Sequence, residues 1–375
     1  MKKIVLALAS VYVYVIAFGQ PLTTPTAEFT IEKIVGATSV KNQAMTGTCW
    51  CFGTTSLVES QCLKNNLGEL DLSEMFTVRN IYKEKARNYI LRQGHTQFGE
   101  GGLGHDMIRA IATYGAIPNS IYSGLLPGQK MHNHQTLEPA LQKYLDSILK
   151  LTPLPANWMD GYNQILDHHL GVVPVEFNYN DKKYTPQTFA TEVVKFNPDD
   201  YVNITSFTHQ PYYKPFIIQV PDNFSNGSYY NLPLKEMLDV VKTSVENGYS
   251  VLWDADVSNN GFRQNRGLAL FVDGGPSIGK EGFTADITEQ PWSAEIRQQL
   301  YENLTTQDDH LMHITGIERS KGGKEFFIVK NSWGQIGPYK GYINVSEAYL
   351  AINTISLIVP RAALNKDLLD KLGIR

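Results

Sequence analysis

The sequence predicts an α+β fold in which helices occupy the first half of the chain and strands dominate the second half. Residues 48–151 contain segments with helix-type patterns and caps, whereas residues from 181 onward are rich in aromatic and β-branched side chains. Helices followed by strands, rather than alternating with them, are typical of α+β proteins. The chain has 375 residues, of which 42% are hydrophobic, and this is enough for one large domain or two modest ones.

The first 19 residues are typical of a secretion signal peptide. Lys2 and Lys3 precede an apolar run from Ile4 to Phe18, and a small residue, Gly19, follows where a signal peptidase would cut. The run is shorter than the roughly 20 residues that span a bilayer, so we expect cleavage rather than anchoring. The sequence therefore predicts an exported protein, periplasmic or extracellular, with no membrane contact once the signal is removed.

A mainly helical lobe is predicted for residues 20–180. The expected helices run from Thr48 to about Asn66, from Ser73 to Ala86, through the segment that ends before Pro118, and from Thr136 to about Leu151. Thr48 and Ser73 are residue types that cap helix N-termini. From about residue 152 to 230 the chain carries no motif, and we interpret this stretch as an insertion.

A mainly β lobe is predicted for residues 181–360. It should contain an amphipathic helix from Leu234 to Asn247, the strand in 249–258, and two further strands at 326–329 and 341–345. The last segment, 361–375, has four leucines at roughly helical spacing. It is expected either to dock as a helix or to reach into a binding cleft as an arm.

Cys49 stands at the predicted start of the first helix, where exposed backbone N–H groups carry partial positive charge. This position should lower the pKa of a thiol and make Cys49 a nucleophile. Cys51 projects from another face of the same helix, and Cys62 lies deeper in it, so both are expected to serve packing. A nucleophilic cysteine needs a base, and the segment 308–345 offers His310, His313 and the amide of Asn331.

Three motifs resemble the signatures of papain-like cysteine peptidases. "NQAMTGTCW" places Gln43 six residues before Cys49, "DHLMHITG" places a glycine six residues after His310, and "KNSWG" contains Asn331 and Trp333. The disulfide cysteine of the family motif is replaced by Thr46. The histidine and asparagine lie 261 (310 − 49) and 282 (331 − 49) residues after Cys49, against about 130–150 in papain. Both departures resemble the bleomycin hydrolase and aminopeptidase C branch.

The resemblance implies a two-lobed papain-like fold, with a helical lobe, an antiparallel β-barrel-like lobe and a cleft between them. It implies that Cys49 is the nucleophile, His310 the base and later the acid, and Asn331 the group that orients the imidazole. Gln43 would donate to the oxyanion. The resemblance further implies substrate-binding or shielding roles for Gly101, Gly102 and Trp333.

The expected activity is hydrolysis of peptide bonds through an acyl-thioester, with a preference for trimming N-termini. A catalytically silent peptide-binding module and a transpeptidase with the same residues are the alternatives, and a zinc site built from Cys-x-Cys and His-x-x-His is disfavoured because those side chains diverge. No cofactor or metal is expected. The partner should be a peptide or protein substrate, and a homo-oligomer is left open. A net charge of −4 without a basic run disfavours nucleic-acid binding.

Overall fold

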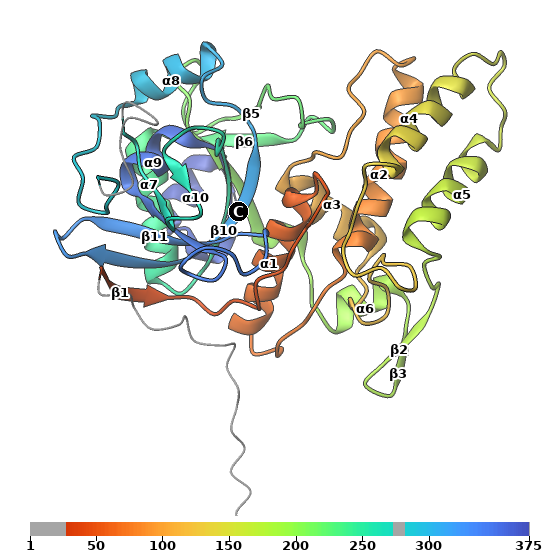
Figure 1. Cartoon of the computed structure of the whole chain (residues 1–375), viewed down its shortest axis with the longest axis horizontal. Coiled ribbons are helices and arrows are strands. Elements are labelled where there is room, and N and C mark those ends of the chain that lie inside the picture. The colour runs from red at the N-terminus through yellow and green to blue at the C-terminus, as the bar shows by residue number, and fades with distance from the viewer. Residues whose placement is uncertain (1–27, 273–281, 375) are drawn as a thin grey trace, which may run out of the picture.

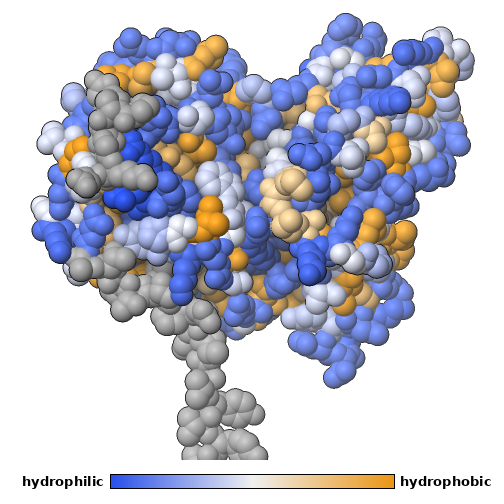
Figure 2. All heavy atoms as spheres, viewed as in Figure 1, coloured by the Kyte–Doolittle hydropathy of each residue, from blue (hydrophilic) through white to orange (hydrophobic). Residues whose placement is uncertain are grey.

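The computed structural model describes residues 28–272 and 282–374, which form a β-rich part and a helical part side by side (Figure 1). The predicted signal peptide lies outside the described residues. Figure 2 shows the same face hollowed between the two parts. The α+β class predicted from the sequence is confirmed, with the helical and the β-rich parts drawn mainly from the first and second halves of the chain.

The helical lobe is built on α1 (Cys49–Lys64), which contacts both α3 and strand β10. Cys51 and Leu57 of α1 are fully buried, so this helix is the central element between the lobes. The other helices of the lobe are α2 (Glu74–Leu91), α3 (Gly104–Tyr114), α4 (Leu137–Ile148), α5 (Trp158–Leu170) and α6 (Pro186–Glu192). Ser73 caps α2 as predicted, since its hydroxyl accepts from the N–H of Phe76.

The β lobe is organised around one eleven-stranded sheet, with the order β5-β6-β4-β13-β7-β10-β11-β12-β9-β8 and β1 paired to β10. Its strands are β1 (Phe29–Ile34), β4 (Tyr201–Thr205), β5 (Pro215–Ile217), β6 (Ser228–Asn231), β7 (Val251–Ala255), β8 (Phe262–Arg263), β9 (Leu268–Ala269), β10 (His310–Ser320), β11 (Glu325–Lys330), β12 (Tyr342–Ser346) and β13 (Thr354–Pro360). The described pairs are antiparallel except β9 with β12 and β4 with β6.

Helices also cover this sheet: the helix predicted to begin at Leu234 is confirmed, whereas those at 294–302 and 347–353 were not predicted. The helices that cover the sheet are α7 (Leu234–Glu246), α8 (Ala294–Glu302), α9 (Glu347–Asn353) and α10 (Lys366–Leu372). Helix α7 buries Met237 and Val241 in the same core as Trp253 of the sheet. No helix in residues 28–272 or 282–374 is both long and apolar enough to cross a membrane.

The stretch interpreted as an insertion divides between the two lobes. Helices α5 and α6, and the hairpin of β2 (Phe177–Tyr179) and β3 (Lys182–Tyr184), belong to the helical side, whereas β4, β5 and β6 extend the large sheet. The loop between β5 and β6 then returns to the helical lobe, where Ser225 bonds to Asp106 of α3.

The C-terminal segment takes the first of its two expected forms and docks as a helix. Leu368 and Leu372 of α10 are buried in the core of the β lobe. Lys371 pairs with Glu236 of α7 at 3.0 Å, and its ammonium lies over the ring of Tyr213. Up to residue 374, the described tail is therefore held against α7.

Candidate active site

Cys49 is the first residue of α1, so its thiol lies at the end of the helix where backbone N–H groups point outward. The side chain is buried, with 8% of the residue exposed. The backbone N–H of Leu311 hydrogen-bonds the sulfur. Because Leu311 follows His310 in β10, this contact brings the start of the predicted nucleophilic helix to the start of the predicted histidine strand.

His310 forms a stacked unit with the two residues predicted to accompany it. Its Nε2 lies 2.7 Å from Oδ1 of Asn331, which directly follows β11. The ring of Trp333 stacks on the imidazole with centroids 4.7 Å apart and 29° between the planes. The asparagine is fixed in turn, because its Nδ2 donates to Oε1 of Gln264 at 3.0 Å. The other nitrogen of His310 is thereby left for chemistry.

His313 is separated from this unit, as the alternation along a strand requires. Its Nδ1 lies 2.8 Å from the hydroxyl of Ser56 on α1, and Lys330 donates to the same hydroxyl at 2.7 Å. His313 is fully buried. These contacts give it a role between α1 and the sheet, apart from Asn331.

Gln43 lies in a loop that hydrogen bonds hold in shape. Its Nε2 donates to the carbonyl of Thr46 at 2.8 Å, and its Oε1 accepts from the hydroxyl of Ser332 at 2.6 Å. The hydroxyls of Thr46 and Thr48 are 2.6 Å apart. Thr46 therefore supports this loop through hydrogen bonds at the position where the family motif has a disulfide cysteine. The second hydrogen of the Gln43 amide remains to serve an oxyanion.

The pKa values of Cys49 and His310 differ from the expectation based on the sequence. Burial raises the pKa of Cys49 to about 12, and the N–H of Leu311 opposes this shift only in part. Burial also lowers the pKa of His310 to about 4, against the effect of Asn331. The expected lowering of the thiol pKa was therefore wrong for this structure, because desolvation outweighs the helix terminus. Both shifts favour the neutral thiol and the neutral imidazole.

Gly101 and Gly102 lie beside Cys49's helix, and both are in close contact with side chains. A Cβ atom at Gly101 would overlap the carboxylate of Asp222, and one at Gly102 would lie 3.1 Å from the ring of Trp50. Trp50 follows the predicted nucleophile and donates its Nε1–H to the carbonyl of Glu100 at 3.0 Å. The glycines are thus required by close packing here, whatever they contribute to substrate binding.

Three carboxyl groups that the sequence did not single out act on the Cys49 thiol. Asp308, Asp254 and Asp222 each raise its pKa, in that order of strength. Asp308 precedes His310 by two residues, which was a readable signal. Asp254 and Asp222 come from distant parts of the sequence, and no local pattern marks them.

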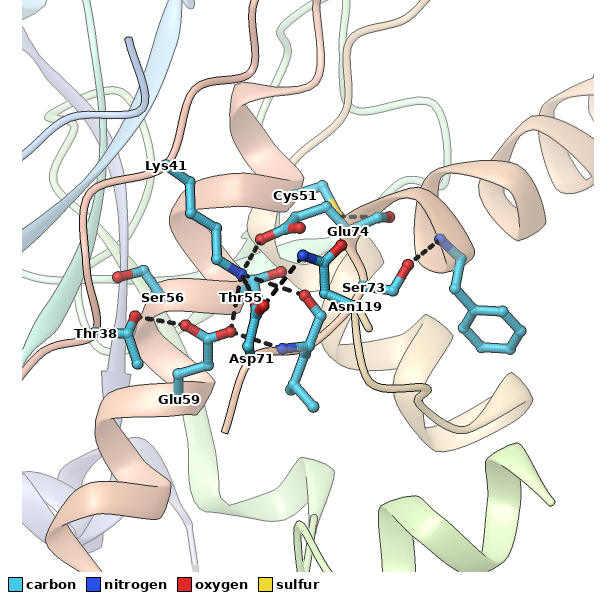
Figure 3. Close-up of polar contacts among 12 residues, drawn as sticks. Thr38, Lys41, Cys51, Thr55, Ser56, Glu59, Asp71, Ser73, Glu74 and Asn119 are labelled. Atoms are coloured by element: carbon cyan, nitrogen blue, oxygen red, sulfur yellow. Dashed lines mark hydrogen bonds and ion pairs between the residues drawn. The ribbon is translucent and has the colours of Figure 1, made fainter. Parts of the chain in front are cut away.

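A cluster around Lys41 fixes the chain just before the Gln43 loop (Figure 3). Its Nζ lies 3.1 Å from Glu59 of α1, 2.7 Å from Glu74 of α2 and 2.7 Å from Asp71. Glu59 also accepts from the hydroxyl of Thr38 at 2.5 Å. This cluster ties the entry segment to the second half of α1 and to the first residue of α2, and so positions the loop that carries Gln43.

The other two cysteines behave as packing residues. Cys51 is fully buried and its thiol lies 3.3 Å from the carbonyl of Glu74, while Cys62 lies 3.8 Å from the carbonyl of Val194. All three cysteines are free thiols. Within the described parts of the chain, no cluster of three or more histidine, cysteine or acidic side chains is arranged to hold a metal ion.

Comparison with known proteins gives a family match and several relatives. A model described as the Peptidase C1-like family matches residues 173–374. "Aminopeptidase C" of Streptococcus thermophilus is 23% identical over 382 residues, covering 88% of this chain and 81% of the relative. "Aminopeptidase C" of Lactobacillus delbrueckii subsp. lactis is 22% identical over 385 residues, covering 90% and 82%.

A solved structure shares the fold. The crystal structure of PepW from Lactobacillus rhamnosis superimposes with a TM-score of 0.70 at 21% identity, covering 93% of this chain and 85% of that one. The match extends over both lobes. The two-lobed architecture that the three motifs implied is thus confirmed for this chain.

Proposed function

The chain belongs to the peptidase C1-like family and is a cysteine peptidase, and from this premise we propose that it is an aminopeptidase with Cys49 as nucleophile. The family match covers 202 of 375 residues (173–374), and the relatives above are named aminopeptidases. The single observation that carries the assignment of residues is the contact of the Cys49 sulfur with Leu311, next to a His310 that is bonded to Asn331.

The reaction proceeds from a neutral pair. His310 takes the thiol proton as Cys49 attacks the carbonyl carbon of the scissile bond, so charge develops only as the substrate arrives. The tetrahedral oxyanion receives hydrogen bonds from the backbone N–H of Cys49 and from the amide of Gln43. His310 then returns the proton to the leaving amine, which departs with the C–N bond, and an acyl-thioester remains on Cys49.

Hydrolysis of the thioester completes the cycle. His310 removes a proton from water, the hydroxide attacks the acyl carbon and the C–S bond breaks. His310 then gives its proton to the sulfur, which restores both the thiol and the neutral imidazole. Asn331 keeps the imidazole in one orientation through both steps by accepting from its Nε2–H, and Trp333 covers that contact from one side. An amine in place of water would give transpeptidation by the same steps.

The experiment that tests this function uses an epoxide inhibitor of cysteine peptidases and mass spectrometry. We expect one adduct, on Cys49, that is lost in Cys49→Ala and slowed in His310→Ala, while Cys51→Ala still reacts. The same variants should lose hydrolysis of aminoacyl-aminomethylcoumarin substrates. An adduct on Cys51, or hydrolysis that survives in Cys49→Ala, refutes the nucleophile, and equal cleavage of free and N-acetylated substrates refutes the aminopeptidase assignment.

We also propose that residues 1–19 direct export of the protein. The positive residues and the apolar run at the N-terminus support this proposal. Fractionation of producing cells, followed by N-terminal sequencing, tests it. A mature protein that begins near Gln20 outside the cytoplasm is expected, and an intact Met1 terminus on cytoplasmic protein would contradict it.

A further inference from the structure

The loop between β5 and β6, residues 218–227, crosses from the sheet to the helical lobe (Figure 1). We call it the strap. Ser225 donates to Asp106 at 2.6 Å and lies 2.8 Å from Nε2 of His105, both at the start of α3. Asn223 stiffens the loop from within, since its side chain bonds to the backbone of Gly227 in both directions. The strap is therefore a fixed part of the junction between the lobes.

The strap brings a carboxylate to the glycine that the sequence marked for substrate binding. Asp222 lies against Gly101 so closely that a Cβ atom there would overlap it. Lys85, beneath the glycines, donates to the carbonyls of Gly99 and Gly101 and interacts with Asp222 through charge. An extended peptide running past Cys49 along Gly101 would meet the strap. The strap therefore limits how far a substrate can extend beyond Cys49 on the side of Gly101.

Two further carboxyls border the same place from the β lobe. Asp254 of β7 pairs in register with Leu311, whose N–H contacts the Cys49 sulfur. One oxygen of Asp254 accepts from Ser356 at 3.0 Å, but its Oδ1 has no hydrogen-bond partner in the part of the chain that the structure describes, although the residue is only 1% exposed. Oδ2 of Asp308 is likewise buried and receives no donor among the described residues. The two carboxyls hydrogen-bond to each other, which requires one of them to carry a proton.

These carboxyls face one another with too little positive charge between them. Burial and the neighbouring carboxyls raise the pKa of Asp254 well above its usual value and that of Asp308 to about 7. Asp222 is affected in the same direction, and Lys85 offsets this only in part. A buried group of like charges is stabilised by a cation that enters it. A positively charged hydrogen-bond donor could replace the proton that Asp254 and Asp308 share and could also meet Asp222.

We propose that Asp222, Asp254 and Asp308 form a subsite that binds a primary ammonium group of the substrate, next to the acyl group that Cys49 attacks. The inference rests on the proposed function and adds the feature that selects its substrates. An ammonium has three donors and suits three carboxyls that converge from the strap and from two strand ends. A substrate can supply this ammonium group in two ways: through the free α-amino terminus of a peptide, or through a lysine side chain one residue before the residue that Cys49 attacks.

The test compares substrates that differ only in that cation. Rates are measured for alanyl-aminomethylcoumarin and its N-acetyl form, and for N-acetyl-lysyl-alanyl- and N-acetyl-norleucyl-alanyl-aminomethylcoumarin. In Asp222→Asn and Asp308→Asn, the preference for the charged member of one pair should fall by roughly ten- to hundredfold, mainly through KM, since each variant weakens a charge-assisted contact. Loss in the first pair identifies the α-amine, and loss in the second pair identifies lysine.

Asp309→Asn is the matched control, because Asp309 is next in sequence but bonds to the exposed turn at Val257 and Ser258. It should keep the preference. If Asp309→Asn loses the preference for the charged substrate to the same extent, the effect comes from the net charge of the region and the subsite is overturned. Unchanged preferences in both Asp222→Asn and Asp308→Asn would also overturn it.

A second measurement covers variants that no longer turn over substrate. Cys49 is labelled with 2-aminoethyl methanethiosulfonate and with its uncharged propyl analogue, and the ratio of the two rates is taken. The ratio should exceed one and fall about tenfold in Asp308→Asn. A ratio that stays constant overturns the subsite, even in an inactive protein. Absence of any hydrolysis by a wild-type chain that labels normally would instead refute the proposed function.

Discussion

The Lys41 cluster gives the sharpest test of how the site is held in place. Lys41→Met removes one cation from contact with three carboxylates of unequal burial. Asp71 is 57% exposed, so solvent screens its share, whereas the Glu59 and Glu74 side chains are 0% and 6% exposed. Removal of one partner from a buried ion pair costs about 3–5 kcal/mol because it leaves an uncompensated charge.

The expected cost converts into a melting shift through the entropy of unfolding. For a chain of this size that entropy is on the order of 0.8 kcal/mol per kelvin, so Lys41→Met should lower Tm by roughly 4–6 °C. Neutral carboxyls need no cation, and burial already raises the pKa of Glu74. The deficit should therefore be larger at pH 8 than at pH 5.

Thermal unfolding of wild type, Lys41→Met and Lys235→Met at both pH values is the assay. Lys235 is the matched control, because it forms an ion pair with Asp239 at 3.2 Å but is 85% exposed, and its loss should cost less than about 1 kcal/mol. If Lys41→Met and Lys235→Met have the same Tm, or if the decrease in Tm caused by Lys41→Met is the same at both pH values, the reasoning about the buried cluster is refuted.

Three further predictions concern the site and the sheet. Asn331→Ala should lower kcat/KM roughly ten- to hundredfold, because His310 loses the 2.7 Å contact that orients it; an unchanged pH–rate profile and rate would contradict this. Gln43→Ala should lower kcat roughly 10²–10³-fold while Cys49 still labels with the epoxide, and a loss of labelling would mean that the loop has collapsed instead. Glu318 has its pKa raised to about 8 by burial, so its contribution favours folding below about pH 4.5 and is lost as pH rises through 8. Glu318→Gln should therefore raise Tm at pH 8 more than at pH 5, and an equal shift at both values would contradict the assignment.

The local parts of the fold could be predicted because their signals are local. Ser73 has the side chain that caps a helix, and α2 begins at the next residue. The helix runs on to Leu91, beyond the predicted end at Ala86, because the next glycine is Gly94 and nothing before it breaks the pattern. Helix α5 was not predicted, since the interpretation of residues 152–230 rested on the lack of a motif rather than on periodicity.

The residues of the candidate site that stand in local motifs could also be predicted, whereas those placed by distant contacts could not. Cys49, His310 and Asn331 stand in short motifs, and the structure brings the histidine and asparagine together and Leu311 to the thiol. Asp222 could not be predicted, because its position beside Gly101 depends on a loop more than a hundred residues away in sequence. The thiol pKa was misjudged for a related reason: the helix terminus is a local feature, whereas desolvation depends on everything packed around it.

The pairing of β1 with β10 joins two segments that lie nearly three hundred residues apart in the sequence. Residues 29–34 lie antiparallel to residues 316–320, so β1 can take its place in the sheet only after residue 320 has been made. Translation proceeds from the N-terminus, and contacts between such distant segments form late. A nascent chain on the ribosome therefore contains Cys49 for most of its synthesis before His310 and the strand that pairs with β1 have been made.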